Sequence, residues 1–486
     1  MLISSWMEES GVAFGTSGAR GLVTAMTDRL CFAYVTGYLQ WMREVGAFSP
    51  GMEVALAGDL RPSSPRILRA CLEAVRKAGG RPLFCGFVPT PCLSLAAFRK
   101  KIPSLMVTGS HIPADRNGIK FNRESQEFSK EDEAGMRRQH VTLPEGLFDH
   151  SGDLITAPEL PAPIDVVTAF LARYRDFFGD NALKDMVVGV YQHSSVARDL
   201  MVDLINALGG RAVPFGRKAT FHPIDTEALT REDTALLRDW AARHQVSAII
   251  SSDGDADRPL LTDHHGNMIR GDIMGLVTAR LLKAAFVATP VTSNTGLELS
   301  QVVPRIARTK IGSPYVLAAM SDPAPVPEGA IIGYEANGGL ILGRRLFNGH
   351  HILDALPTRD FALPLIATLI SARDYGDDLN RLIEALPKRA TASTCLKDTS
   401  RDQGLALVAH FSACAETDAF RAALGIPGHL DHIDETDGTR LFFTSGDILH
   451  IRPSGNAPEL RLYVEANTQA GADRLLKAAE AYIRTL

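Results

Sequence analysis

The chain has 486 residues, of which 45% are hydrophobic and 22% are charged, and its formal net charge is −5. The composition excludes a disordered or fibrous protein, and the length predicts three or four folding units rather than one core. Since no long run of one charge sign is present, a nucleic-acid footprint and a polybasic membrane surface are also excluded.

The start of the chain and its cysteines indicate a cytoplasmic protein. Residues 1–9 lack the basic and apolar regions of a signal peptide, and no later stretch of about 20 residues is apolar enough to span a bilayer. The six cysteines form no C-x-x-C pair and lie mostly in apolar sequence, as expected of buried thiols in a reducing compartment. We therefore expect neither membrane nor nucleic-acid partners.

The first polar segment, residues 14–21, reads Phe-Gly-Thr-Ser-Gly-Ala-Arg-Gly. Its glycines allow backbone amides to approach an anion, and Arg20 adds a guanidinium group. The segment predicts a phosphate contact, while a plain glycine-rich turn is the alternative.

Residues 53–85 are typical of a strand, a helix and a second strand. The helix begins at Ser64-Pro65 and has apolar residues at helical spacing, and Gly79-Gly80-Arg81 ends it and starts the next strand. The same order returns at residues 186–215, and a weaker copy spans 286–312. The sequence therefore predicts an internal repeat of three related α/β units.

A hydroxyl group with an adjacent imidazole follows the apolar run 105–107. Ser110 and His111 lie in the loop Thr-Gly-Ser-His-Ile-Pro, and Lys120 follows an Asn-Gly turn that returns it toward this loop. Taken alone, a turn hydroxyl and a surface lysine explain these residues. The carboxylates and arginines elsewhere in the chain favour a phosphate-carrying serine, with Lys120 as a candidate acid/base.

Three carboxylates alternate after the next long apolar run. Asp253, Asp255 and Asp257 converge on one side of extended backbone, which is tolerated where a hard cation binds. A calcium EF-hand is excluded because that loop needs glycine and glutamate where Arg258 and His264 stand. The spacing favours Mg²⁺, with Arg258 facing a phosphate, over a solvated acidic turn.

Two later segments predict contacts to a sugar and to a phosphate. In residues 333–339, Glu335 and Asn337 can bind sugar hydroxyls, although an ordinary connection has the same composition. Residues 452–458 combine a guanidinium group, a hydroxyl, free amides and an amide side chain, which favours a cradle for a non-reacting phosphate over a plain loop. The further substrate-binding candidates are Arg452, Ser454, Gly455, Asn456 and Arg461, together with Lys310 in the third repeat.

The last hundred residues predict a smaller α+β unit. Strand-like pieces at 438–443 and 448–452 lie between helical segments at 401–415 and 470–485. The predicted domains are 1–156, 157–266, 267–378 and 379–486.

The order and content of these segments resemble the α-D-phosphohexomutase superfamily, and within it the bacterial phosphomannomutase/phosphoglucomutase group, over nearly the whole chain. The family's serine loop, usually T-A-S-H-N-P with a later N-G-x-K, is similar to residues 108–120, and its metal loop D-G-D-x-D-R to residues 253–258. Its sugar loop G-E-x-S-G-H is similar to residues 334–339, and its phosphate loop R-x-S-G-T-E-P to residues 452–458. The chain departs from the family pattern at Ile112, Asn337, Gly339 and Asn456-Ala457. The reaction class is therefore better supported than the sugar.

The resemblance implies an α/β fold of three similar domains, each a mixed sheet flanked by helices, plus a C-terminal α+β domain like the TATA-binding protein, around a central cleft. It implies hexose 6-phosphate and hexose 1-phosphate interconversion through a phosphoserine and a bound hexose 1,6-bisphosphate, with mannose phosphate first and glucose phosphate second. The implied roles are phosphoserine for Ser110, Mg²⁺ binding for Ser110, Asp253, Asp255 and Asp257, proton transfer for His111 and Lys120, and phosphoryl support for Arg20 and Arg258.

Two other classes stay open at this point. A metal-dependent sugar phosphatase would use the same groups but lose the phosphate to water, and a non-catalytic sugar-phosphate sensor would carry no phosphoserine. Within the mutases, a phosphoglucosamine mutase fits the sugar loop less well. We expect a monomer or a weak homodimer whose partner is a small phosphosugar.

Overall fold

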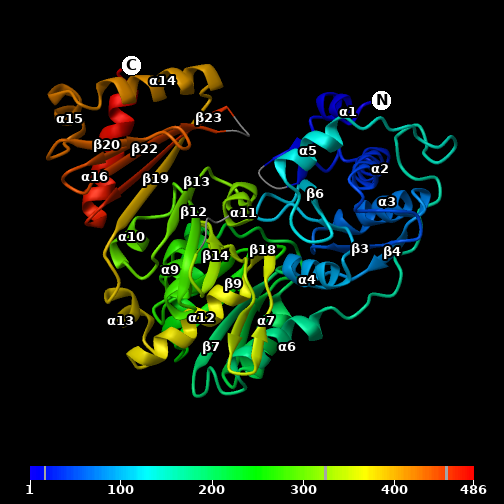
Figure 1. Ribbon diagram of the computed structural model, residues 1–486, viewed down its shortest axis with the longest axis horizontal. Coiled ribbons are helices and arrows are strands. Elements are labelled where there is room, and N and C mark those ends of the chain that lie inside the picture. The colour runs from blue at the N-terminus through cyan, green and yellow to red at the C-terminus, as the bar shows by residue number, and fades with distance from the viewer. Residues whose placement is uncertain (16–17, 322–325, 455–457) are drawn as a thin grey trace.

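The structure is a computed structural model that describes residues 1–15, 18–321, 326–454 and 458–486. Four large sheets follow one another along the chain (Figure 1). The N-terminal unit, blue to cyan, and the C-terminal unit, orange to red, lie on either side of the green and yellow middle units.

The first three sheets share one strand order. The first contains β1 (Ala13–Phe14), β2 (Ala19–Leu22), β3 (Glu53–Gly58), β4 (Arg81–Phe84), β5 (Ser104–Val107) and β6 (Arg116–Asn122). The second contains β7 (Val187–His193), β8 (Arg211–Arg217), β9 (Ala248–Ser252), β10 (Pro259–Thr262) and β11 (Met268–Ile269). The third contains β12 (Ala284–Pro290), β13 (Ile306–Thr309), β14 (Ala330–Tyr334), β15 (Leu340–Leu342) and β18 (Leu356–Asp360). Between its last two strands, β16 (Leu346–Asn348) and β17 (His351–Leu353) form a separate ribbon.

The common order is β6-β5-β3-β4, β10-β9-β7-β8 and β15-β14-β12-β13. In each sheet three strands are parallel and the fourth runs antiparallel to them. The predicted internal repeat of three α/β units is therefore confirmed.

Helices connect the strands and cover the sheets. Those of the first unit are α1 (Ile3–Ser10), α2 (Asp28–Glu44), α3 (Ser64–Lys77), α4 (Thr90–Lys100) and α5 (Lys130–Arg137). Next come α6 (Val167–Phe178), α7 (Arg198–Ala207), α8 (Arg231–Arg243), α9 (Gly271–Leu281), α10 (Gly296–Ser300), α11 (Ser313–Ser321), α12 (Ala362–Ala372) and α13 (Leu379–Glu384), with a 3-10 turn at Arg373–Tyr375. No described helix has the length and apolar character needed to cross a membrane.

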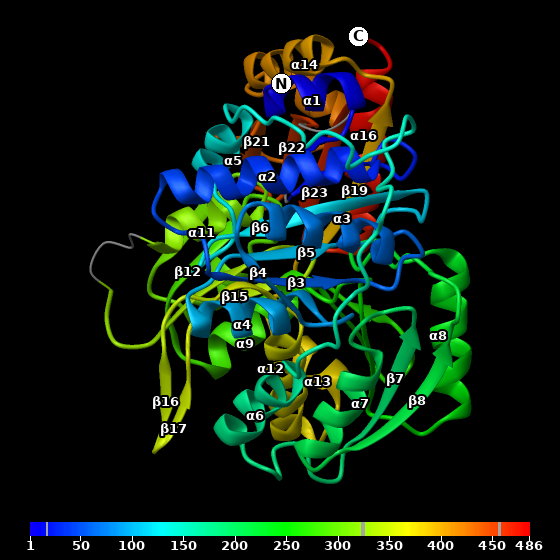
Figure 2. The ribbon, with the colours of Figure 1, turned by 90° about the vertical axis from the view of Figure 1, so that its right-hand side faces the viewer.

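Helix α3 illustrates how local sequence sets these elements. Pro65 occupies its first turn, its apolar face is buried, and Gly79 with φ of 81° follows its end. In Figure 2, α2 and α4 lie on opposite sides of the first sheet. The sheet thereby separates two apolar cores, one under α2 and α3 and one under α4.

The α4 core continues without a break through all of the first three sheets. It contains Met106 from the first sheet, Ile250 from the second and Ile332 from the third, all buried. Helix α4 packs against β18 of the third sheet, and α12 packs against β10 of the second. The three repeated units therefore form one body rather than three separate ones.

The C-terminal unit has a different architecture and its own core. Five antiparallel strands lie in the order β19 (Ala390–Lys397), β23 (Glu459–Ala466), β22 (Ile448–Pro453), β21 (Thr439–Phe443) and β20 (Leu430–Asp434). The helices α14 (Arg401–Cys414) and α16 (Gln469–Ile483) pack on this sheet, and α15 (Asp418–Leu424) packs against α16. The core of this unit contains Phe411, Leu449 and Leu462. The predicted C-terminal α+β unit is thus confirmed.

Candidate active site

Three of the four predicted segments occupy the same position in the three repeated sheets. Ser110 lies between β5 and β6, residues 253–258 between β9 and β10, and residues 335–339 between β14 and β15. Each connection joins the last parallel strand of its sheet to the antiparallel strand that follows. The repeat itself therefore presents three chemically different loops in equivalent places.

Ser110 is fully buried and joins the first loop to the second. Its Oγ donates to Asp253 Oδ2 at 2.6 Å and lies 3.3 Å from His111 Nδ1. Its backbone φ is 57°, a left-handed value that a non-glycine residue adopts only under constraint. Thr108 Oγ1 accepts the Ser110 N–H at 2.8 Å and helps to supply that constraint.

Asp253, Asp255 and Asp257 form a buried carboxylate cluster in which one oxygen of each lies within 4.8 Å of the others. Asp255 Oδ1 and Asp257 Oδ1 are buried and have no hydrogen-bond partner among the described residues. Burial, followed by the charges of Asp255 and Asp257, raises the pKa of Asp253 well above its usual range. Three buried oxygen ligands with two unsatisfied atoms fit a hard divalent cation.

Lys120 contacts two of these carboxylates. Its Nζ donates to Asp255 Oδ2 at 2.6 Å and also to Asp257 Oδ2. Although burial alone would raise the pKa of Asp257, Arg359, Lys120 and Arg258 hold it below its usual range. The predicted Asn-Gly turn is wrong, because Asn117 and Gly118 lie within β6 and pair with β2. Strand β6 nevertheless brings the ammonium group of Lys120 to the carboxylate cluster.

The imidazole of His111 is neutral in this site. Arg258 Nη1 donates to His111 Nδ1 at 3.1 Å, and burial, then Arg258 and Arg20, lower the pKa of His111 to about 2. Burial and the neighbouring Arg258 lower the pKa of Arg20 to about 10, which leaves this guanidinium charged at neutral pH. Two guanidinium groups therefore lie close to His111.

Arg359, on β18, is a site residue that sequence reasoning missed. It is 2% exposed and pairs with Asp257 at 2.8 Å, Glu335 at 3.6 Å and Glu127 at 3.7 Å. It thereby connects carboxylates from the first, second and third units. Its only signal in the sequence is an Arg-Asp pair that directly precedes an apolar helix.

The residues of the sugar loop have mainly structural partners. The Glu335 carboxylate faces Arg359, and Asn337 Oδ1 accepts the Gly339 N–H at 2.9 Å. Thr226 Oγ1 donates to the Asn337 carbonyl at 3.0 Å and ties this loop to the second unit.

The phosphate-binding candidates lie on and near the C-terminal sheet. Arg452 Nε is 3.3 Å from Asp437 Oδ1, and Asp437 Oδ2 accepts the Ile311 N–H at 3.0 Å, next to the exposed Lys310. Ser454 is buried, and its N–H donates to the Glu459 carbonyl at 2.7 Å. Gly455 and Asn456 lie outside the described residues.

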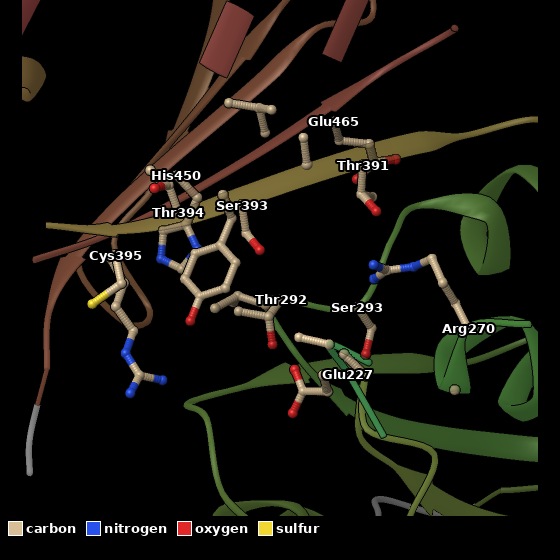
Figure 3. A pocket seen from close by; sticks show the side chains of 18 of the residues that line it. Glu227, Arg270, Thr292, Ser293, Thr391, Ser393, Thr394, Cys395, His450 and Glu465 are labelled. Carbon is tan, nitrogen blue, oxygen red and sulfur yellow. The ribbon is translucent and has the colours of Figure 1, made fainter. Parts of the chain in front are cut away.

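A cavity of about 410 Å³ lies between the middle units and the C-terminal sheet (Figure 3). His111 and Arg461 are the predicted site residues that line it. In Figure 3, Glu227, Arg270, Thr292 and Ser293 of the middle units face Thr391, Ser393 and His450 of the C-terminal strands.

Sequence reasoning missed two residues of this cavity, Arg270 and His450. The first is held by an ion pair, and the second has a lowered pKa. Arg270 makes a two-point ion pair with Asp272, at 3.1 and 2.8 Å. His450 Nε2 contacts the Asp437 carbonyl at 2.6 Å, and burial lowers the pKa of His450 to about 4. Because both lie in otherwise ordinary strand and helix-start sequence, only the packed structure reveals them.

Comparison with known families gives three matches along the chain. Models of the phosphoglucomutase/phosphomannomutase family match residues 11–142 as alpha/beta/alpha domain I, 270–390 as alpha/beta/alpha domain III and 408–481 as the C-terminal domain.

Two curated relatives carry the name phosphomannomutase. That of Sinorhizobium fredii is 41% identical over 471 residues, covering 96% of this chain and 97% of the relative. That of Salmonella muenchen is 38% identical over 480 residues, covering 99% and 97%.

Solved structures share the fold at low sequence identity. A putative phosphomannomutase from Thermus thermophilus has a TM-score of 0.75 at 19% identity and covers 97% of this chain and 99% of its own. An Aspergillus fumigatus N-acetylphosphoglucosamine mutase, solved with GlcNAc-6P and magnesium, has a TM-score of 0.61 at 12% identity and covers 100% and 99%.

Proposed function

Because the chain belongs to the phosphoglucomutase/phosphomannomutase family, we propose that it interconverts the 6-phosphate and the 1-phosphate of a hexose. The single observation that carries the proposal is the buried Ser110 hydroxyl, hydrogen-bonded to a carboxylate of the Asp253 cluster. The names of the two relatives at 41% and 38% identity support mannose phosphate as the preferred substrate, with glucose phosphate second.

In the proposed reaction, Ser110 begins as a phosphoserine. The bond between its Oγ and phosphorus breaks as a bond forms from a free hydroxyl of the hexose phosphate, and the hydroxyl proton ends on Ser110 Oγ. The hexose 1,6-bisphosphate then reorients in the site, and its other phosphate is transferred to Ser110 Oγ. No phosphate is gained or lost over the cycle.

The side chains proposed to move the proton are Lys120 and His111. Lys120 Nζ is held by Asp255 and Asp257, and His111 Nδ1 lies 3.3 Å from Ser110 Oγ. Arg20 and Arg258 would bind the oxygens of the transferred phosphoryl group, where phosphoryl transfer needs charge neutralisation and in-line positioning.

The proposed metal is Mg²⁺, bound by Asp253, Asp255, Asp257 and an oxygen of phosphoserine 110. When bound, it would neutralise charge on the phosphoryl oxygens. The buried cluster with two unsatisfied oxygen atoms supports this assignment.

The cavity is proposed to hold the rest of the substrate. Its 410 Å³ suits a hexose phosphate, since small-molecule sites span about 300–1,000 Å³. Glu335 and Asn337 would bind sugar hydroxyls. The group proposed for the non-reacting phosphate is Arg452, Ser454, Gly455, Asn456, Arg461 and Lys310. The domain boundaries, a cytoplasmic location and a monomer or weak homodimer remain predictions.

The test supplies the protein with Mg²⁺, a trace of hexose 1,6-bisphosphate, and either mannose 1-phosphate or glucose 1-phosphate, followed by phosphorus NMR. We expect the corresponding 6-phosphate to form from both substrates, with the higher kcat/KM for mannose 1-phosphate. Release of inorganic phosphate without isomer would identify a phosphatase instead. Binding without turnover, together with no added phosphate in the intact mass, would identify a sensor.

A further inference from the structure

Arg61 lies in the connection between β3 and α3, at the carboxyl end of a parallel strand, and is 1% exposed. Its Nη1 donates to the carbonyls of Pro113 at 2.7 Å and Arg116 at 2.9 Å. Its Nη2 donates to the carbonyls of Ser110 at 2.9 Å and Ile112 at 2.6 Å. One guanidinium group therefore holds four carbonyls of the loop that carries Ser110.

The fifth N–H of this guanidinium group belongs to a chain of hydrogen bonds that leads back to the Ser110 amide. Arg61 Nε donates to Asp59 Oδ2 at 3.1 Å, which also accepts from Thr108 Oγ1 at 2.8 Å. Thr108 Oγ1 in turn accepts the Ser110 N–H at 2.8 Å. A single buried ion pair thereby fixes both the carbonyl and the amide of Ser110, and all five donors of the arginine are used.

The surroundings leave the loop no room to shift. A Cβ on Gly109 would lie 2.6 Å from Arg61 Cζ, and a Cβ on Gly254 would lie 2.9 Å from the Ser110 carbonyl oxygen. The Phe221 ring from the second unit covers the guanidinium group, with 4.1 Å between Arg61 Cζ and the ring centroid. The arrangement holds Ser110 in its left-handed conformation, next to the Asp253 loop.

We propose that Arg61 is a positioning residue for phosphoryl transfer, which sets the place of Ser110 Oγ relative to the carboxylate cluster. The inference rests on the proposed function, because transfer in both directions needs the same in-line placement of that one oxygen. A displacement of about 1 Å costs roughly a hundredfold in rate. Lysine cannot replace Arg61, since an ammonium group has three donors and lacks the planar fork.

The experiment compares Arg61→Lys with the matched variant Arg66→Lys. Arg66 also binds one carboxylate, Asp28 at 2.7 Å, and a backbone carbonyl, Met26 at 2.8 Å, but its hydrogen bonds with the described residues do not reach the serine loop. For Arg61→Lys we expect kcat to fall by about a hundredfold in both directions with KM nearly unchanged. For Arg66→Lys we expect kcat close to that of the wild type.

Two further readouts separate positioning from loss of folding. Asp59→Asn weakens the same chain of hydrogen bonds and is expected to lower kcat in the same way. Added guanidinium ion is expected to restore part of the activity of Arg61→Ala. Amide hydrogen exchange over residues 108–116 should quicken in Arg61→Lys and not in Arg66→Lys.

The proposal is overturned if Arg61→Lys keeps the kcat of the wild type, or if Arg66→Lys loses as much. It is also overturned if exchange in the serine loop is the same in both variants. A wild-type protein without mutase turnover would refute the proposed function instead, and the exchange measurement would still decide whether Arg61 holds this loop.

Discussion

Ser110 Oγ and Asp253 Oδ2 are 2.6 Å apart, although 143 positions of the chain separate the two residues. Both side chains are fully buried, and they belong to equivalent loops of the first and second sheets. Ser110 and the proposed metal ligands are thus brought together by the association of two units. Catalysis should depend on that contact as much as on either residue alone.

Replacement of Ser110 by alanine removes the proposed phosphate carrier and leaves the carboxylates in place. We expect mutase turnover to fall by more than about a thousandfold, since no other group takes over the covalent step. The matched control is Ser251→Ala, a buried serine on β9 whose hydroxyl donates to the Tyr191 carbonyl at 2.7 Å. Steady-state mutase assays of both variants test this, and normal turnover in Ser110→Ala would end the nucleophile assignment.

Asp255→Asn should reduce activity and weaken Mg²⁺ binding together. The change removes one negative charge from the cluster, so we expect kcat to fall about 10²–10³-fold and the Mg²⁺ concentration for half-maximal activity to rise. Asp263→Asn is the control, because this buried carboxylate binds only its own turn, through the N–H groups of His265 and Asn267. Titration with Mg²⁺ after chelator treatment measures the effect, and retained activity with unchanged dependence would show a purely structural acidic turn.

Arg359→Met should destabilise the protein. It leaves Asp257, Glu127 and Glu335 buried without their shared cation, and breaking a buried ion pair in this way costs about 3–5 kcal/mol. Arg345→Met removes an exposed partner of Asp354 and should cost about 0–1 kcal/mol. Urea unfolding of both variants makes the comparison, and equal losses would contradict the central role of Arg359.

His193 should make stability fall in mild acid. Burial lowers its pKa to about 4 in the folded protein, against the ordinary value of 6.5. Between these values the unfolded chain binds a proton that the folded protein rejects, so stability present at pH 7 is lost as pH falls. The loss amounts to about 2 kcal/mol between pH 7 and pH 5.

The His193→Asn variant should show a smaller decline over this range. Asparagine tolerates the positive φ of 23° at this position and has no group that titrates in this range. The exposed His350→Asn serves as the control. Thermal unfolding at the two pH values measures the difference, and an equal decline in all three proteins would refute the assignment.

Local signals in the sequence were sufficient for much of the fold and for part of the site. The Ser-Pro helix start, the Gly-Gly-Arg stop and the alternating carboxylates each depend on neighbouring residues, and the structure has α3, β4 and the Asp253 cluster there. Arg61 and Arg359 carry no such signal. Arg61 lies 49 positions from Ser110 and 52 from Pro113, and Arg359 lies 232 positions from Glu127. These contacts form only when distant segments of the chain associate.

Because the C-terminal sheet has its own core, residues 390–486 could be replaced as one unit. An engineer could graft this piece from a relative that holds the non-reacting phosphate differently. The graft would have to re-form the hydrogen bond from the Ile311 N–H to Asp437 and those that Thr295 and Arg389 make with Glu465. The first three sheets cannot be exchanged singly in this way, because each contributes residues to one shared apolar core. The C-terminal unit is therefore the part of the molecule that can be exchanged with the least disturbance of the remaining core.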